Sequence, residues 1–302
     1  MTDRLSLTST TVPGWGMRAE VLRGGEGDPV VLLHGDLPPA PTDPLALALA
    51  RHHEVIAPVH PGFRHPDDAN PLHDVHDVAL YHDDLLGSLG LGPVPVVGHS
   101  FGGMVAAELA AHVPGRVSRL GLLAPYGLWR DDEPVADLLA AFPLELAPLL
   151  WADPAGPAAG EAMAALLDSD DGPSPGEPPP PEARPGAPSD AAATTAGVGS
   201  PTPGVQAPAA AQALQRMLPG LATVGRFLWP LPDKGLARRL HRVAAPTLII
   251  WGAEDRLIPP SYATDLSGRI PGSRVELVAG AGHMVTVECP DEVARLLEQL
   301  LG

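Results

Sequence analysis

Uninterrupted apolar runs and amphipathic segments alternate along most of the chain. Runs such as 29–33 and 247–251 are typical of strands buried on both faces of a parallel sheet. Segments such as 74–89 place apolar residues at helical spacing with charged residues between them, which predicts amphipathic helices. Because strand and helix follow each other in turn, the pattern predicts an α/β protein with a doubly wound, mostly parallel sheet. The expected strands are 16–23, 29–35, 54–58, 94–97, 117–124, 246–252 and 273–278, and the expected helices are 45–50, 74–89, 104–111, 209–229, 260–270 and 290–301.

This alternation breaks down in the middle of the chain, within 126–235. A short helix is expected at 161–167, and 169–208 is a low-complexity segment rich in proline and alanine. Since almost no side chain of that segment could be buried, we expect it to be disordered or extended. The prediction is a core made of 1–125 and 236–302, with 126–235 inserted into it as a helical lid.

Ser100 lies where a β-prone run turns directly into a helix-forming run. Gly98 and Gly102 flank it at two residues on either side, which is the G-x-S-x-G pattern of a nucleophile elbow. A strained turn needs small neighbours there, because Cβ atoms at these positions would collide with the backbone. A helix that begins at the serine also directs free N–H groups toward an oxyanion. The motif in this context predicts a nucleophilic serine.

A serine hydroxyl needs a base, and the base needs an orienting acid. His283 is the last histidine of the chain and follows the expected strand 273–278 in a glycine-rich loop. Asp255 follows the expected strand 246–252, and its neighbour Glu254 is the alternative acid. Serine, acid and histidine in this order, each at the end of a strand, predict a catalytic triad of Ser100, Asp255 and His283.

Two backbone N–H groups are expected to form the oxyanion hole. The first is that of Phe101, directly after the serine, and the second is that of Asp36, with Leu37 as the alternative. The acidic side chain of Asp36 is unusual beside an oxyanion hole, and it could point away or help to select the substrate. Apolar residues expected to line a substrate pocket, or merely to pack the lid on the core, are Leu37, Phe142, Trp151, Phe227, Trp229 and Met284.

Taken together, these motifs resemble the α/β-hydrolase superfamily, and most closely its small, lid-bearing esterase-like members. The resemblance covers about 16–127 and 236–302, and it implies an eight-stranded, mostly parallel sheet with a lid inserted after the strand that ends near Ala124. The loop at 60–63 is similar to a Pro-Gly-Phe turn of the family, although His60 and Arg64 depart from it. The motifs that carry the resemblance are Leu33-His34-Gly35, Gly98-His99-Ser100-Phe101-Gly102-Gly103, Gly252-Ala253-Glu254-Asp255-Arg256 and Gly282-His283.

The expected function is that of a serine hydrolase that cleaves a small ester, thioester or lactone through an acyl-enzyme. The same triad could instead serve C–C bond hydrolysis of a β-diketone-like substrate, acyl transfer or perhydrolysis, and the motifs do not separate these reactions. A non-enzymatic ligand receptor on the same fold is a third hypothesis. An intact triad argues against it, because a receptor has no need of all three residues.

Composition and charge restrict the partners and the compartment. The 302 residues carry a formal net charge of −17, which argues against nucleic acid or an anionic membrane surface as a partner and leaves a small-molecule substrate. The single cysteine, Cys289, excludes an intrachain disulfide. Neither a signal peptide nor a run of transmembrane length is found, so a cytoplasmic location is expected, with export by another route left open. No oligomeric state is predicted.

The histidines and aspartates of 52–84 are the one alternative group that could suggest a metal, through seven residues at 73–84. It lacks an H-E-x-x-H motif and a tight His-x-His pair, and these residues also suit the solvent-exposed face of a helix. We therefore predict no metal and no cofactor. The residues of this group are His73, Asp74, His76, Asp77, His82, Asp83 and Asp84.

Overall fold

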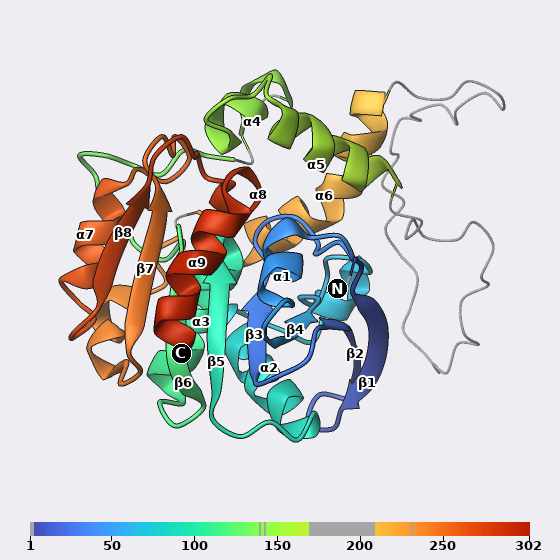
Figure 1. Ribbon diagram of the computed structural model, residues 1–302, viewed down its shortest axis with the longest axis vertical. Coiled ribbons are helices and arrows are strands. Elements are labelled where there is room, and N and C mark those ends of the chain that lie inside the picture. Colours follow the sequence, from blue (N-terminus) through green and yellow to red (C-terminus); the bar gives the residue numbers. More distant parts are fainter. Residues whose placement is uncertain (1–2, 139, 142, 169–208, 231) are drawn as a thin grey trace, which may run out of the picture.

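An eight-stranded sheet forms the centre of the computed structural model, which describes residues 3–138, 140–141, 143–168, 209–230 and 232–302 (Figure 1). The strand order is β1-β2-β4-β3-β5-β6-β7-β8, and every pair from β4 to β8 is parallel, whereas β1–β2 and β2–β4 are antiparallel. The prediction of an eight-stranded, mostly parallel sheet is confirmed. The strands are β1 (Ser6–Val12), β2 (Met17–Gly24), β3 (Pro29–Leu33), β4 (Glu54–Pro58), β5 (Val94–His99), β6 (Val117–Leu123), β7 (Thr247–Gly252) and β8 (Arg274–Val278).

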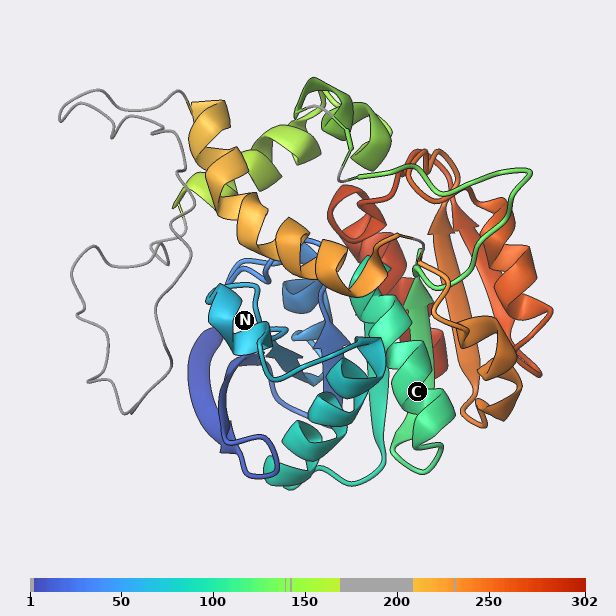
Figure 2. The same ribbon diagram turned by 180° about the vertical axis from the view of Figure 1, so that it is seen from behind.

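Helices cover both faces of the sheet, as expected for strands that are apolar on both sides. Figure 1 shows α1 and α9 in front of the strands, and Figure 2, from behind, shows α2 and α3 on the opposite face. The α-helices are α1 (Pro44–Leu49), α2 (Val75–Ser88), α3 (Ser100–His112), α4 (Pro143–Leu150), α5 (Pro157–Asp168), α6 (Ala209–Leu228), α7 (Ser261–Ser267), α8 (Val285–Glu288) and α9 (Pro290–Leu301). In the part of the chain that the structure describes, the connections also contain short 3₁₀ helices, namely η1 (Pro66–Ala69), η2 (Leu236–Arg238) and η3 (Leu240–Arg242).

The strand at the β1 edge of the sheet was not expected from the sequence. We predicted the segment 16–23 as the first, edge strand, but it forms β2, and β1 pairs with it along its whole length from Ser6↔Arg23 to Val12↔Met17. Only the last residue of β1 is buried, and its sequence, SLTSTTV, accordingly shows no alternation of apolar and polar residues. Threonine-rich segments suit an exposed edge, where solvent covers one side of the strand.

Helices α4, α5 and α6 occupy the chain between β6 and β7, where the inserted segment was expected. They lie beyond the ends at which β7 and β8 finish (Figure 1), and α6 runs across the molecule toward α3 (Figure 2). Leu221, Val224 and Phe227 of α6 belong to the same buried apolar cluster as residues of the sheet. The predicted low-complexity segment 169–208 lies outside the described residues. Within the described parts of the chain, no helix combines the length and apolarity needed to span a bilayer.

Candidate active site

Ser100 stands at a strained turn between β5 and α3. Its φ is +52°, in the left-handed region that a residue other than glycine rarely adopts. A Cβ on Gly98 would lie 2.3 Å from the carbonyl oxygen of Gly102, and a Cβ on Gly102 would lie 2.3 Å from that of Leu33. Both positions therefore require glycine, as the motif predicts. Ser100 is polar and contributes nothing to the apolar packing of the core. Backbone strain at such a residue is typical of functional positions.

A chain of hydrogen bonds links the three residues of the predicted triad. His283 Nε2 lies 2.7 Å from Ser100 Oγ, and His283 Nδ1 lies 2.9 Å from Asp255 Oδ2. The other oxygen of Asp255 accepts the backbone N–H groups of Leu257 and Ile258, both at 2.9 Å, so the loop fixes the carboxylate in place. The alternative acid, Glu254, is exposed, whereas Asp255 is buried. The arrangement gives Ser100 a base and gives that base an orienting acid.

The side chain of Asp36 points into the site, which decides between the two orientations that the sequence left open. Ser100 Oγ donates a hydrogen bond of 2.8 Å to Asp36 Oδ2, which also lies 3.8 Å from His283 Nε2. Asp36 is buried, and its Oδ1 has no hydrogen-bond partner among the described residues. Phe101, the first residue of α3 after the serine, has a backbone N–H with no acceptor within its own helix. In the resting site, the Ser100 hydroxyl therefore makes hydrogen bonds both to the His283 imidazole and to the Asp36 carboxylate.

The charges around Ser100 shift the protonation of its neighbours. Burial disfavours the charged form of His283, but Asp255 and Asp36 outweigh it and raise the pKa of His283 to about 9. Burial, followed by the charges of Asp36 and Asp255, raises the pKa of Tyr126 well above its ordinary value, while a hydrogen bond with the Ser100 side chain opposes the shift. Tyr126 was not predicted from the sequence, because it lies close to Ser100 only through the turn of the chain at the end of β6.

Three buried histidines form a neutral hydrogen-bonded chain behind the loop that carries Asp36. His82 Nε2 donates to His60 Nδ1 at 2.8 Å, and His60 Nε2 donates to the carbonyl oxygen of His34 at 3.0 Å. The backbone N–H of His60 in turn donates to His34 Nε2 at 2.9 Å. Burial is the main cause that lowers the pKa of all three, that of His60 to about 4. The chain connects the loop after β3 to α2, so it positions the Asp36 loop without carrying charge.

The end of α4 is joined to the His283 loop by hydrogen bonds. The N–H of Met284 donates to the carbonyl oxygen of Leu150 at the end of α4, at 3.0 Å. Glu288 accepts the N–H groups of Gly282 at 2.7 Å and Ala152 at 2.8 Å, and so holds the end of α4 against the His283 loop. These contacts fix how α4 sits beside the predicted base.

A cavity of about 1000 Å³ opens beside Ser100, and its walls include Asp36, Leu37, His99 and Met284. Leu37 and Met284 were expected at a pocket, and Ser100 itself is buried behind this wall. The other expected residues that the structure describes do not line this cavity. Trp151 and Phe227 are buried in the core, Trp229 is 61% exposed, and Phe142 lies outside the described residues. Phe227 stacks on Phe101 with ring centroids 6.1 Å apart.

The histidines and aspartates of 73–84 do not gather at one place. His82 belongs to the buried histidine chain, and His73 is exposed. His76 instead faces α3, where it meets Glu108 and His112. These three side chains are the only group among the described residues with the spacing to hold a metal ion.

Comparison with known proteins agrees with this architecture. A family model described as the alpha/beta hydrolase fold matches residues 28–290. The 2-hydroxymuconate semialdehyde hydrolase of Pseudomonas putida is 27% identical, over 95% of this chain and 92% of its own. Among solved structures, a mutant of the meta-cleavage product hydrolase CumD from Pseudomonas fluorescens IP01 matches with a TM-score of 0.66 and 20% identity, over 97% of both chains. The naproxen esterase of Bacillus subtilis matches with a TM-score of 0.65 and 17% identity, over 99% of this chain and 92% of its own. At these identities the two structures support the fold alone.

Proposed function

The chain belongs to the α/β-hydrolase family, and on that premise we propose that it is a serine hydrolase that cleaves a small carboxylic ester, thioester or lactone. The observation that carries the proposal is the hydrogen-bonded series Asp255–His283–Ser100, with contacts of 2.9 and 2.7 Å. The series lies beside a cavity of about 1000 Å³, which suits a small organic molecule.

In the proposed reaction, Ser100 Oγ forms a bond to the carbonyl carbon and His283 Nε2 takes the hydroxyl proton. The carbonyl oxygen becomes an oxyanion, for which the N–H groups of Phe101 and Asp36 are the proposed donors. The tetrahedral species then collapses, and the leaving alcohol or thiol departs with the proton from His283. A water molecule next gives its proton to His283 and its oxygen to the acyl carbon. Ser100 regains the proton, and the carboxylic acid is released.

The Asp36 carboxylate adds a condition to this reaction. The hydroxyl proton of Ser100 points to Asp36 Oδ2 in the resting site, not to His283. For the transfer to His283, the serine hydroxyl must rotate away from Asp36 and His283 must be neutral. We propose that the substrate, on entering, displaces this contact and that Tyr126, whose hydroxyl stays protonated, supplies a further hydrogen bond close to Ser100.

The test is hydrolysis of a series of p-nitrophenyl esters of increasing acyl length, with Ser100→Ala beside the parent protein. Ser118→Ala is the matched control, because Ser118 lies near the start of β6, at the opposite end of the sheet. We expect Ser100→Ala to lose turnover and Ser118→Ala to keep it, with a fluorophosphonate adduct found by mass spectrometry on Ser100. Equal turnover by the parent and Ser100→Ala would exclude the proposal, and a lack of labelling in the folded parent would favour a receptor.

A second candidate function is hydrolysis of a C–C bond beside a ketone. It is favoured by the full-length similarity to the Pseudomonas putida relative, which is named for a semialdehyde substrate. The same residues would serve, but the leaving group would be a carbanion equivalent that needs a proton. A panel that contains both ring-cleavage diketones and simple esters separates the two. Turnover of the diketones without turnover of the esters would assign the C–C reaction.

A further inference from the structure

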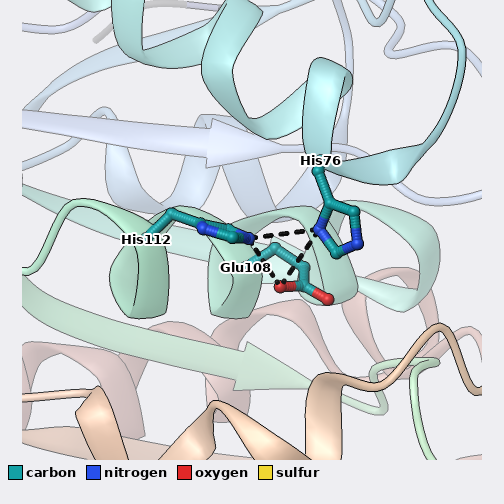
Figure 3. Close-up of side chains that lie close together, drawn as sticks. All are labelled: His76, Glu108 and His112. Carbon is teal, nitrogen blue, oxygen red and sulfur yellow. Dashed lines mark hydrogen bonds and ion pairs between the residues drawn. The ribbon is translucent and has the colours of Figure 1, made fainter.

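A second cluster of polar side chains lies between α2 and α3, away from the predicted active site. His76 comes from the first turn of α2, and Glu108 and His112 lie one turn apart on α3 (Figure 3). Glu108 is eight residues beyond Ser100 on the same helix, which places it about 12 Å along the axis from the serine. The reaction proposed above makes no use of this cluster.

The three donor atoms already have the spacing of metal ligands. His112 Nε2 lies 3.1 Å from His76 Nδ1 and 3.5 Å from Glu108 Oε2, and His76 Nδ1 lies 3.7 Å from the same oxygen (Figure 3). In a tetrahedral zinc site with bonds of 2.0–2.1 Å, neighbouring ligand atoms lie about 3.3–3.4 Å apart. The triangle in the protein therefore needs shifts of only a few tenths of an ångström to receive an ion.

Neighbouring residues orient the proposed ligands and leave the cluster accessible to an ion from solvent. The Glu108 side chain is fully buried, whereas those of His76 and His112 are each 29% exposed, so an ion can enter from the solvent side. Arg239 holds the carboxylate of Glu108, with Nη2 2.6 Å from Oε1 and Nε 2.9 Å from Oε2. Hydrogen bonds of this kind to a ligating carboxylate are usual in metal sites, because they fix its orientation.

From this geometry we propose that His76, Glu108 and His112 form a zinc-binding site that joins α2 to α3, with water in the fourth position. Two imidazoles and one carboxylate are a donor set that Zn²⁺ accepts. The positive charge of Arg239 opposes that of the ion, so we expect weaker binding than at a site of the same ligands without a neighbouring cation.

The test uses the full chain freed of metal by dialysis against a chelator. Titration with Zn²⁺ in competition with a chromophoric chelator is expected to give one saturable site, together with a rise of several degrees in Tm. Co²⁺ in place of Zn²⁺ is expected to give the intense visible bands of a four-coordinate ion. His76→Ala and His112→Ala are expected to lose binding, the Tm rise and the bands, while the matched control His73→Ala, an exposed histidine just ahead of α2, keeps all three.

Two results would overturn the site. One is the absence of saturable binding in the parent, and the other is unchanged affinity in both His76→Ala and His112→Ala. If either variant fails to fold, the Co²⁺ spectrum of the parent decides alone, since weak octahedral bands mean that the ion sits elsewhere. His283→Ala is expected to bind Zn²⁺ as before, whether or not the proposed hydrolysis is correct. Loss of binding in that variant would assign the ion to His283 and not to this cluster.

Discussion

At the scale of single residues, His283 lies between two carboxylates, and this sets the pH dependence of the proposed reaction. Asp255 and Asp36 outweigh burial and raise the pKa of His283 to about 9. Only the neutral imidazole can accept the Ser100 proton, so kcat/KM should rise with pH up to about 9. In Asp36→Asn one of the two carboxylate charges is gone. The acid limb of kcat/KM should then move to lower pH by about one unit or more, measured as a pH–rate profile.

The control for this prediction is Glu161→Gln, which removes another carboxylate from the wall of the same cavity. We expect its acid limb to coincide with that of the parent. If the limb of Asp36→Asn also stays in place, Asp36 does not act on His283. If Asp36→Asn is inactive at every pH while it still folds, Asp36 itself is the group that removes the serine proton.

The neighbouring acids Asp255 and Glu254 give a second prediction. Asp255 holds His283 Nδ1 at 2.9 Å, and Glu254 is exposed. Asp255→Asn should lower kcat by roughly 10⁴-fold, because an amide can hold the wrong tautomer of the imidazole. Glu254→Gln should remain close to the parent. Steady-state kinetics on one ester substrate measures both, and a larger loss in Glu254→Gln would reverse the assignment.

The positions of the three predicted triad residues could be inferred from the sequence because each stands in a local motif after its own strand. Asp36 was found as a position, but the direction of its side chain was left open, since that direction depends on how the loop after β3 meets the elbow. Tyr126 was not found, because nothing in its own segment indicates that β6 ends beside Ser100. Contacts between distant segments are set by packing, which a single sequence does not display.

At the scale of the elements, α6 approaches the Asp36 loop more closely than a side chain would permit. A Cβ on Gly220 would lie 2.8 Å from the carbonyl oxygen of Asp36 and 3.0 Å from the Phe63 ring. Gly220→Ala should therefore shift α6 or the loop, cost about 1–3 kcal/mol in the free energy of unfolding, and lower kcat/KM. Urea unfolding and ester kinetics measure the two effects.

The matched change is Gly160→Ala on α5, where a Cβ would meet no atom within 4 Å. Alanine is the better helix former, so this variant should gain roughly 0.5–1 kcal/mol in stability and keep its kinetics. Equal stability and activity in both variants would mean that α6 does not press on the Asp36 loop.

The predicted elements that match the structure are those with a strong apolar pattern, such as α2, α9 and the strand β7. The edge strand β1 was missed because an exposed strand has no apolar alternation to reveal it. The one-turn helix α8 was missed for a different reason, since four residues are too few to show a helical period. The hydrophobic pattern therefore predicts the long, buried elements of the fold but not an exposed edge strand or a very short helix.

At the scale of the whole molecule, four buried histidines should limit stability in acid. Burial is the first cause that lowers the pKa of His34, His60, His82 and His99, those of His60 and His99 to about 4. An unfolded histidine titrates near 6.5. Between these values the unfolded chain binds protons that the folded chain does not, so stability falls as pH falls from 6.5 toward about 4. Each such histidine contributes up to about 1.4 kcal/mol per pH unit in this window.

His283 acts in the opposite direction. Its pKa is raised in the folded protein, so the stability that it contributes is present below 6.5 and is lost as pH rises through about 9. The free energy of unfolding should therefore be greatest between the two windows, near neutral pH, although the optimum of the proposed reaction lies above it. Activity and stability are therefore expected to have different pH optima. Burial favours the neutral form of four histidines, whereas Asp255 and Asp36 favour the charged form of His283 although it is buried too.

His60→Phe tests the acid limb of this stability profile. The ring volume is nearly kept, and the site is already lined by the rings of Phe63 and Phe101. The variant should lose about 1–3 kcal/mol at neutral pH, because the N–H of His82 and the carbonyl of His34 lose their partner. Its stability should also fall less steeply below pH 6.5, by up to about 1.4 kcal/mol per unit. Urea unfolding at a series of pH values measures both, with the exposed His65→Gln expected to keep the slope of the parent. An unchanged slope in His60→Phe would show that His60 takes up its proton in the folded state.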